Sequence, residues 1–137
     1  MTPFRLKLGD ALWQHVLRPY LFGKDAEDAH LFTVRVLKRF QELRLLWLLR
    51  LIYASPYADQ PIAIFGVRWR NQLGMPAGFD KHAEVMPALA ALGFGSVEHG
   101  TTPPLPQPGN PRKRLFRYPS SRAIINRYGF NSIGAVA

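Results

Sequence analysis

The chain has 137 residues, no cysteine and a formal net charge of +9 at pH 7. The lack of cysteine excludes disulfides, thiolate metal sites and a cysteine nucleophile, and the length favours one domain. The positive charge suits nucleic acid, an anionic membrane or anionic substrates. It is not one block, since residues 1–55 carry nine Lys and Arg against five acids, and residues 56–137 carry nine against four. A nucleic-acid module more often concentrates its charge on one face, so we expect no nucleic-acid partner.

The first half of the chain has the pattern of helices. Apolar side chains recur at helical spacing over residues 12–20, and Pro19 or Gly23 is expected to end this segment. Asp25 is expected to cap the next helix, with Asp28 three residues later in the manner of a capping box. That helix then presents one apolar face, formed by Phe32, Val36, Leu37 and Phe40.

A third helix is predicted over residues 43–53, where nearly every residue is apolar. Such a helix must be buried somewhere, and two interpretations stay open. One is packing against a protein core. The other is a membrane interface, because aromatic and flanking basic residues suit the headgroup zone, namely Trp13, Tyr20, Trp47 and Tyr53.

Neither a secretory signal nor a membrane-spanning helix is expected. Asp10 interrupts the first apolar stretch, and no cleavage site follows a run of the needed length. The apolar run over residues 43–53 is shorter than the roughly 20 residues that cross a bilayer. We therefore expect the protein to be made in the cytoplasm and to stay on that side of any membrane.

After Pro56 the periodicity changes to that of strands. Residues 62–71 read as two short strands around Gly66. Residues 73–79 read as a buried strand that ends in a ligand loop, 84–92 as a helix that Gly93 stops, and 94–98 as the next buried strand. Strand, helix and strand in this order form a βαβ unit, which predicts a parallel sheet.

Two further segments complete the chain. Residues 103–111 contain five prolines and are expected to form an extended loop. Residues 115–118 and 123–125 can pair as a hairpin around Pro119-Ser-Ser121.

Two polar, glycine-bearing segments, residues 76–81 and 126–131, suggest one shared binding site. Lys81 supplies a point charge with three donors, and each asparagine supplies a donor and an acceptor on one planar group. The first segment follows a predicted strand, and ligands bind at that edge of parallel α/β sheets. Gly100-Thr101 takes the same position after the next strand. A flat, anionic, amide-rich ligand fits these groups.

Other chemistries find no support in the sequence. The four histidines are scattered, so we expect no metal site. His99 lies beside the predicted site, where a packed or hydrogen-bonded role is more usual than acid–base chemistry. The chain has no Walker loop, no G-x-G-x-x-G and no G-x-S-x-G motif.

The chain resembles the amino-terminal portion of the quinone-dependent (class 2) dihydroorotate dehydrogenases. The likeness is loose before residue 60 and close after residue 70. The last matching segment, Ile125-Asn-Arg-Tyr-Gly-Phe-Asn131, is the most specific. The other matching segments are Asp25-Ala-Glu-Asp-Ala-His30, Asn71-Gln-Leu-Gly74, Ala77-Gly-Phe-Asp-Lys81, Leu92-Gly-Phe-Gly-Ser-Val-Glu98, Gly100-Thr101, Pro106-Gln-Pro-Gly-Asn-Pro111 and Arg114-Leu-Phe-Arg117.

The resemblance implies an α/β fold, with residues 56–137 forming the first strands and helix of an FMN-binding (β/α)8 TIM barrel. It also implies that residues 1–55 are a helical, membrane-associated segment at the mouth of a quinone tunnel. The family oxidises dihydroorotate to orotate in pyrimidine (UMP) biosynthesis: a serine base removes a proton, a hydride passes to the flavin, and quinone reoxidises it. The resemblance thus implies that the protein is peripheral to a bacterial inner membrane, on its cytoplasmic face.

The resemblance also implies roles for particular residues. Those expected to contact FMN are Ala77, Gly78, Phe79, Asp80, Lys81 and Thr101. Lys81 would touch both flavin and substrate, because a cation stabilises an anionic reduced flavin and attracts the orotate carboxylate. Those expected to bind the amide edge of the substrate are Asn126, Arg127, Tyr128, Gly129, Phe130 and Asn131.

The sequence departs from the family pattern after the second strand. The family has Thr-Val-Thr-Pro and a basic residue, whereas this chain has Thr101-Thr-Pro-Pro-Leu105. Pro103 removes a backbone donor and fixes φ, and His99 stands where the family has an aliphatic residue.

The other departure is length, because a barrel of this type takes about 250 residues. The catalytic serine would lie beyond Ala137, so we expect these residues alone to be inactive and poorly folded. Two alternatives stay open: another FMN barrel oxidoreductase acting on a planar substrate, or a non-catalytic, basic membrane-surface or interaction protein derived from the same fold.

Overall fold

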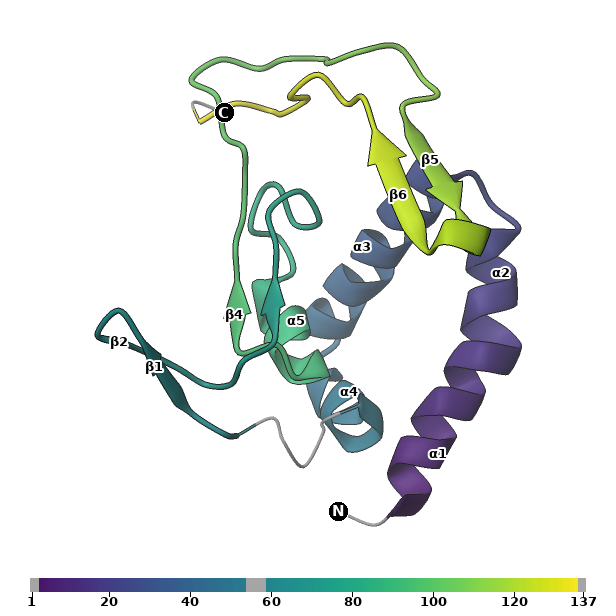
Figure 1. Cartoon of the computed structure of the whole chain (residues 1–137), viewed down its shortest axis with the longest axis vertical. Helices are drawn as coiled ribbons and strands as arrows, with labels where there is room; N and C mark the ends of the chain where they lie inside the picture. The colour runs from purple at the N-terminus through teal and green to yellow at the C-terminus, as the bar shows by residue number, and fades with distance from the viewer. Residues whose placement is uncertain (1–2, 54–58, 136–137) are drawn as a thin grey trace.

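The computed structural model describes residues 3–53 and 59–135 (Figure 1). Most of its helices lie in the first half of the chain, and its three short strand pairs lie in the second half. The boundary expected at Ser55-Pro56 lies outside these residues. The first helical rod is continuous and comprises α1 (Pro3–Leu12), a π-helical turn (Trp13–Leu17) and α2 (Arg18–Phe22). It is followed by α3 (Ala26–Glu42) and α4 (Leu46–Tyr53).

The ends of the first helices follow from local chemistry. Gly23 caps the rod, whereas Pro19 lies in the first turn of α2, where a missing N–H is tolerated. The prediction of Gly23 as the stop is confirmed, and that of Pro19 is wrong. Asp25 caps α3, because its carboxylate accepts a bond of 3.0 Å from the Glu27 amide. The carboxylate of Asp28, the expected partner in a capping box, instead accepts a bond of 2.9 Å from the Arg112 guanidinium.

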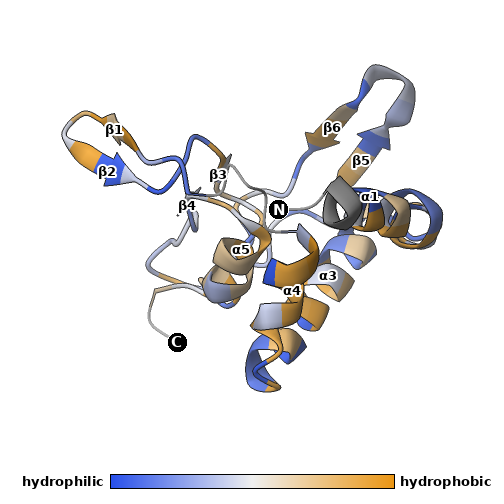
Figure 2. Ribbon diagram, turned by 90° about the horizontal axis from the view of Figure 1, so that it is seen from below, coloured by the Kyte–Doolittle hydropathy of each residue, from blue (hydrophilic) through white to orange (hydrophobic). Residues whose placement is uncertain are grey.

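The hydrophobic core lies where α3, α4 and α5 (Met86–Leu92) meet. Leu37 of α3 and Leu49 of α4 are buried there against fully buried residues of the α5 segment, Val85, Ala88, Leu89 and Ala91. The two halves of the chain therefore share one core. Figure 2 shows apolar colouring on α4 and the helices beside it, and also on strands outside this core.

The predicted helix over residues 43–53 is only partly buried. It begins at Leu46, because Arg44 adopts a positive φ of 57°. Leu49 is in the core, whereas Trp47 remains 58% exposed. The core interpretation is thus confirmed for one face of α4 alone, and the other face stays open to solvent. No helix within residues 3–53 or 59–135 combines the length and apolarity that a membrane span requires.

The second half contains three two-stranded sheets among the described residues. In the first, β1 (Ile62–Ile64) pairs antiparallel with β2 (Val67–Trp69) around Gly66, as predicted. In the second, β3 (Gly74–Met75) pairs parallel with β4 (Ser96–Val97), and α5 connects them. The third is the predicted hairpin of β5 (Leu115–Tyr118) and β6 (Ala123–Asn126).

The βαβ prediction is therefore confirmed, although its strands are shorter than the pattern suggested. Gly93 ends α5 with φ +109°, a conformation that glycine adopts readily. β3 and β4 have only two residues each, because the ladder ends where the chain turns into loops. The mixed α/β architecture fits the start of a barrel.

The loops beyond β3 and β4 come together at one end of the molecule (Figure 1). Residues 76–84 form the loop after β3. The proline-rich loop, residues 103–111, runs beside the last residues of the chain: Gln107 pairs with Ser132, and the Ala135 amide donates to the Pro103 carbonyl at 2.9 Å. This arrangement brings the two sequence motifs to the same region.

Candidate functional site around Lys81

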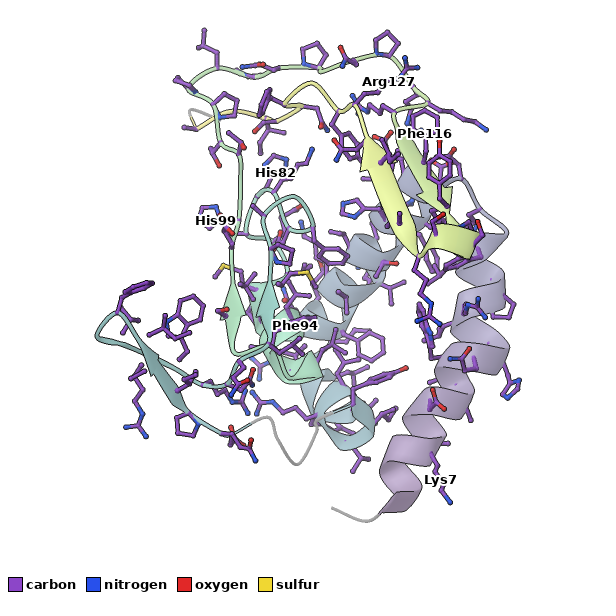
Figure 3. All side chains as sticks on the ribbon, in the orientation of Figure 1. Lys7, His82, Phe94, His99, Phe116 and Arg127 are labelled. Carbon is purple, nitrogen blue, oxygen red and sulfur yellow. The ribbon has the colours of Figure 1, made fainter. Side chains whose placement is uncertain are left out.

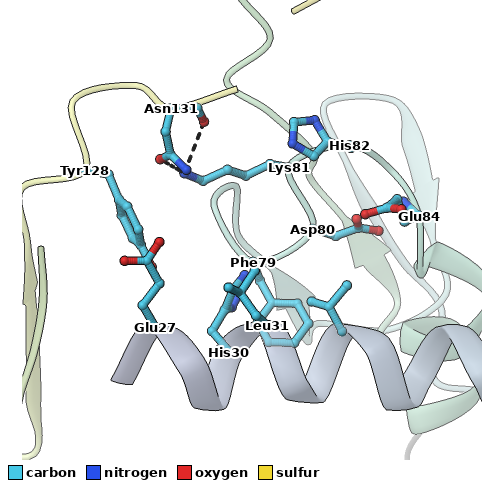
Figure 4. A pocket seen from close by; sticks show the side chains of 11 residues that line it. Glu27, His30, Leu31, Phe79, Asp80, Lys81, His82, Glu84, Tyr128 and Asn131 are labelled. Carbon is cyan, nitrogen blue, oxygen red and sulfur yellow. Dashed lines mark hydrogen bonds between the residues drawn. The ribbon is translucent and has the colours of Figure 1, made fainter. Parts of the chain in front are cut away.

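Lys81 and Asn131 meet, although 50 residues separate them in the sequence (Figure 4). The Lys81 ammonium donates to the side-chain oxygen of Asn131 and, at 3.4 Å, to its backbone carbonyl. The same ammonium lies 4.1 Å from the centroid of the Tyr128 ring. The two polar segments therefore lie next to each other, as one shared binding site would require.

The loop that carries Lys81 is fixed by its neighbour Asp80. The Asp80 side chain is almost fully buried, and its two oxygens accept bonds of 2.8 Å from the amides of Glu84 and Val85. These amides begin the turn that leads into α5, so the carboxylate joins the loop to the helix. Gly78, at φ +104°, allows the chain to turn before this point, and no atom lies within 4 Å of the place where a Cβ would stand.

Glu27, at the start of α3, is a buried carboxylate with two guanidinium partners. Its exposed fraction is 5%. It pairs with Arg114 at 2.8 Å and with Arg112 at 3.0 Å. The hydrogen bond from Arg114 is the largest cause that holds the pKa of Glu27 below its usual value, and burial opposes it. Charge-assisted bonds of this kind are among the strongest in proteins.

Arg114 connects Glu27 to the rest of the site. Its Nη1 donates to the carbonyls of Pro108 and Asn110 at 2.8 and 2.9 Å, while Nε and Nη2 face Glu27. Its guanidinium carbon lies 5.2 Å from the centroid of the Tyr128 ring. One arginine therefore holds α3, the proline-rich loop and Tyr128 together.

The electrostatics of Lys81 follow from these neighbours. Burial is the largest cause that lowers the pKa of Lys81, and the positive charge of Arg114 lowers it further, whereas Glu27 raises it. Burial likewise raises the pKa of Tyr128, and Glu27 adds to that increase. The site thus holds a half-buried ammonium beside an uncharged phenol.

His30 of α3 forms the floor beside Phe79. The two rings meet edge to face, with centroids 5.1 Å apart. Burial, followed by the charge of Lys81, lowers the pKa of His30. A pocket of about 100 Å³ lies between α3, the loop that carries Phe79 and Lys81, and the pair of Tyr128 and Asn131. Drug-sized ligands occupy about 300–1,000 Å³, so this pocket holds only part of a larger molecule.

Of the residues expected to bind ligands, Phe79, Asp80, Lys81, Tyr128 and Asn131 line this pocket. The others lie outside it: Ala77, Gly78, Thr101, Asn126, Arg127, Gly129 and Phe130.

Several of the outlying residues have structural surroundings of their own. Arg127 donates to the Lys113 carbonyl at 3.0 Å and lies 5.8 Å from the Phe116 ring (Figure 3). Gly129 has φ +68°, and a Cβ there would come within 2.9 Å of Asn110. Phe130 is 69% exposed.

The unusual loop after β4 remains open to solvent. Thr101, Leu105 and His99 are all exposed, with Leu105 at 71%. The carbonyl of Pro103 accepts a bond of 2.9 Å from the Ala135 amide, so this proline joins the loop to the end of the described chain.

Sequence reasoning missed the contribution of α3. Glu27 and Arg114 both lie in segments that carried the family resemblance, but neither was assigned a role. An acidic residue in the first turn of a helix is already explained by its favourable interaction with the helix dipole, so Glu27 did not stand out. The positive charge of Arg112-Lys-Arg114 could have indicated the pair, because basic side chains that become buried need an acidic partner.

The chain was compared with known proteins. Residues 61–137 match the family model for dihydroorotate dehydrogenase. A dihydroorotate dehydrogenase (quinone) from Verminephrobacter eiseniae is 48% identical over 120 residues, which are 88% of this chain and 32% of that protein. The enzyme of the same name from Chromobacterium violaceum is 50% identical over 122 residues, covering 89% of this chain and 34% of that protein.

Solved structures agree with the sequence matches. A crystal structure of DHODH in complex with ferulenol from Eimeria tenella superposes with a TM-score of 0.67 at 35% identity, and covers 84% of this chain and 30% of that one. This chain spans about a third of the length of the curated relatives it matches. The chain belongs to the dihydroorotate dehydrogenase family.

Proposed function

We propose that these residues form the first third of a quinone-dependent dihydroorotate dehydrogenase, which oxidises dihydroorotate to orotate in pyrimidine biosynthesis. The observation that carries the proposal is the meeting of Lys81, Tyr128 and Asn131 from two distant segments. The names of the relatives support the substrate and the quinone.

The residues present fit FMN as the cofactor. A half-buried ammonium suits an anionic ring system or a carboxylate, and the open backbone at Gly78 leaves space for a flat ligand. FMN, when bound, supplies the acceptor for the hydride of dihydroorotate. We propose that Ala77 to Lys81 and Thr101 hold it. Asp80 would act through the backbone, because its side chain is bonded to the amides that precede α5.

We propose that Lys81 binds the carboxylate of dihydroorotate and that the segment from Asn126 to Asn131 binds its amide edge. A carboxylate would compete with the Asn131 oxygen for the ammonium, and so release the Asn131 amide for the ring. An amide pair rejects substrates that lack matching groups more strongly than an apolar pocket does. The serine base and the remaining flavin contacts would come from the rest of the barrel, so these 137 residues alone would be inactive.

Residues 1–55 are proposed to lie on the membrane surface, as a segment distinct in function from residues 56–137. Large apolar side chains are exposed along the helices: Leu8, Trp13, Val16, Tyr20, Phe22, Leu31, Leu43, Trp47 and Leu51. Basic residues accompany them, as in helices that bind anionic lipid surfaces. This location would give quinone access to the flavin from the bilayer, on the cytoplasmic face of a bacterial inner membrane.

Complementation tests the proposal. Residues 1–137 are co-expressed with the remaining barrel segment of the Chromobacterium violaceum enzyme, and the purified complex is examined for flavin absorbance. We expect a yellow protein that bleaches anaerobically when dihydroorotate is added. A complex that binds liposomes but no flavin would favour the alternative, a non-catalytic membrane-surface protein. A flavin that is bleached by other planar substrates and not by dihydroorotate would favour another FMN oxidoreductase.

A further inference from the structure

Glu27 of α3 is a buried acidic side chain that two arginines contact. Arg112 and Arg114 both contact Glu27, at 3.0 and 2.8 Å. Lys81 lines the same pocket as Glu27. In contrast, Asp28, the next acid on α3, is half exposed and contacts only Arg112 in the bonds described. Glu27 is therefore placed to balance the charge of the site.

Glu27 reaches Lys81 through two intermediate side chains. It holds the Nε and Nη2 of Arg114, which leaves the guanidinium beside Tyr128. The Tyr128 ring in turn contacts the Lys81 ammonium at 4.1 Å. Cations attract the face of an aromatic ring, so both positive groups are held by the same side chain. Figure 4 shows Glu27 next to Tyr128, with Lys81 beyond the ring.

We infer that Glu27 is a positioning residue for Lys81: it fixes Arg114 beside Tyr128 and so determines where the Lys81 ammonium lies and which charges surround it. The position of α3 is then coupled to the cation of the site. This inference deepens the proposed function, because Lys81 is the cation proposed to meet dihydroorotate. It concerns the protein side chains alone and can be tested without flavin or substrate.

The charges that face Lys81 determine whether its pKa should rise or fall when Glu27 is neutralised. The titratable groups around its pocket are Glu27, His30, Asp80, His82, Glu84 and Tyr128, with Arg114 behind Tyr128. Burial and Arg114 lower the pKa of Lys81, whereas Glu27 raises it. Neutralising Glu27 must therefore lower that pKa further. A variant that merely loosens the structure would expose Lys81 to water and raise its pKa, because burial is the largest cause of the present shift.

The experiment is competitive labelling of lysines with acetic anhydride as a function of pH, read by mass spectrometry, in the complex of residues 1–137 with the remaining barrel segment. Lys7, which is exposed on α1, is the internal reference. Glu27→Gln keeps the shape of the side chain and removes its charge. Asp28→Asn is the matched control, because it removes a neighbouring charge that contacts Arg112 and not Arg114. Arg114→Gln removes the opposing charge. A thermal melt confirms that each variant retains a cooperative transition.

We expect the labelling midpoint of Lys81 to move to lower pH in Glu27→Gln, to higher pH in Arg114→Gln, and to stay in place in Asp28→Asn. An unchanged or raised midpoint in a folded Glu27→Gln variant would overturn the inference. Loss of the cooperative transition in both Glu27→Gln and Arg114→Gln would also overturn it, since the pair would then have a purely structural role. The labelling midpoints do not depend on enzyme activity. The positioning role of Glu27 can therefore be refuted independently of the proposed dehydrogenase function.

Discussion

The loop that carries Lys81 should depend on Asp80 for its stability. Replacing Asp80 with alanine removes the acceptor for two amides, those of Glu84 and Val85, each bonded at 2.8 Å. Hydrogen bonds to a charged group contribute about 1.5–3 kcal/mol each. Val85 is fully buried, so its amide has no access to water, whereas Glu84 is exposed and water can replace part of its bond. The expected loss is therefore about 2–4 kcal/mol in the free energy of unfolding.

The assay is urea unfolding of the complex of residues 1–137 with the remaining barrel segment, with the free energy taken from the midpoint and the slope. Asp80→Asn retains one acceptor oxygen and should lose about half as much. Asp59→Ala is the control, because that carboxylate is 77% exposed in its pair with Arg70, and ion pairs so open to water contribute little to stability. A loss in Asp80→Ala no larger than in Asp59→Ala would refute the structural role derived for Asp80.

Three further predictions concern stability. Leu89→Ala empties a position that is 1% exposed in the core and should reduce the free energy of unfolding by about 2–5 kcal/mol in the same urea assay. Gly129→Ala should destabilise by more than Gly66→Ala, by about 1 kcal/mol or more in circular-dichroism melts, because both have positive φ but only at Gly129 would a Cβ meet a neighbour, Asn110. The pKa of Glu27 is lower in the folded state than its ordinary value of 4.5, so the stabilisation is fully present above pH 4.5 and is lost as the pH falls through the folded pKa. Urea midpoints measured from pH 7 to pH 3 should therefore fall less steeply in Glu27→Gln.

The sequence predicted most of the second half of the chain because its signals are local. Glycines stop or turn the chain at Gly66 and Gly93, and the residues around them alternate as strands or repeat as a helix. The βαβ unit and both hairpins follow from these signals. Strand lengths did not follow, since β3 and β4 end where their pairing ends, and pairing is a tertiary property.

The first half was less predictable because its contacts are distant in sequence. The apolar pattern of α4 does not say which face meets α5, and only Leu49 became buried. Pro19 looked like a helix stop, yet its position in the first turn of α2 makes it compatible with a continuing helix.

In the candidate site, too, residue types and motifs were predictable, whereas contacts between distant residues were not. Lys81 and Asn131 were predicted to share a location from their residue types and from the family resemblance, and they do. The buried pair of Glu27 and Arg114 joins residues 87 apart and leaves no periodic trace in the sequence. The sequence did not reveal that the Asp80 carboxylate accepts bonds from two backbone amides, and the expected contact of Asp80 with FMN stays a prediction.

Anaerobic flavin reduction by dihydroorotate in the complemented protein tests whether Lys81 belongs to the dihydroorotate site. Lys81→Ala should raise the dihydroorotate concentration needed for half-maximal reduction by about 30-fold or more, as expected for the loss of about 2 kcal/mol from a charge pair. Lys38→Ala, which removes an exposed lysine paired with Glu84, should leave it unchanged. Equal behaviour of the two variants would contradict the assignment of the site.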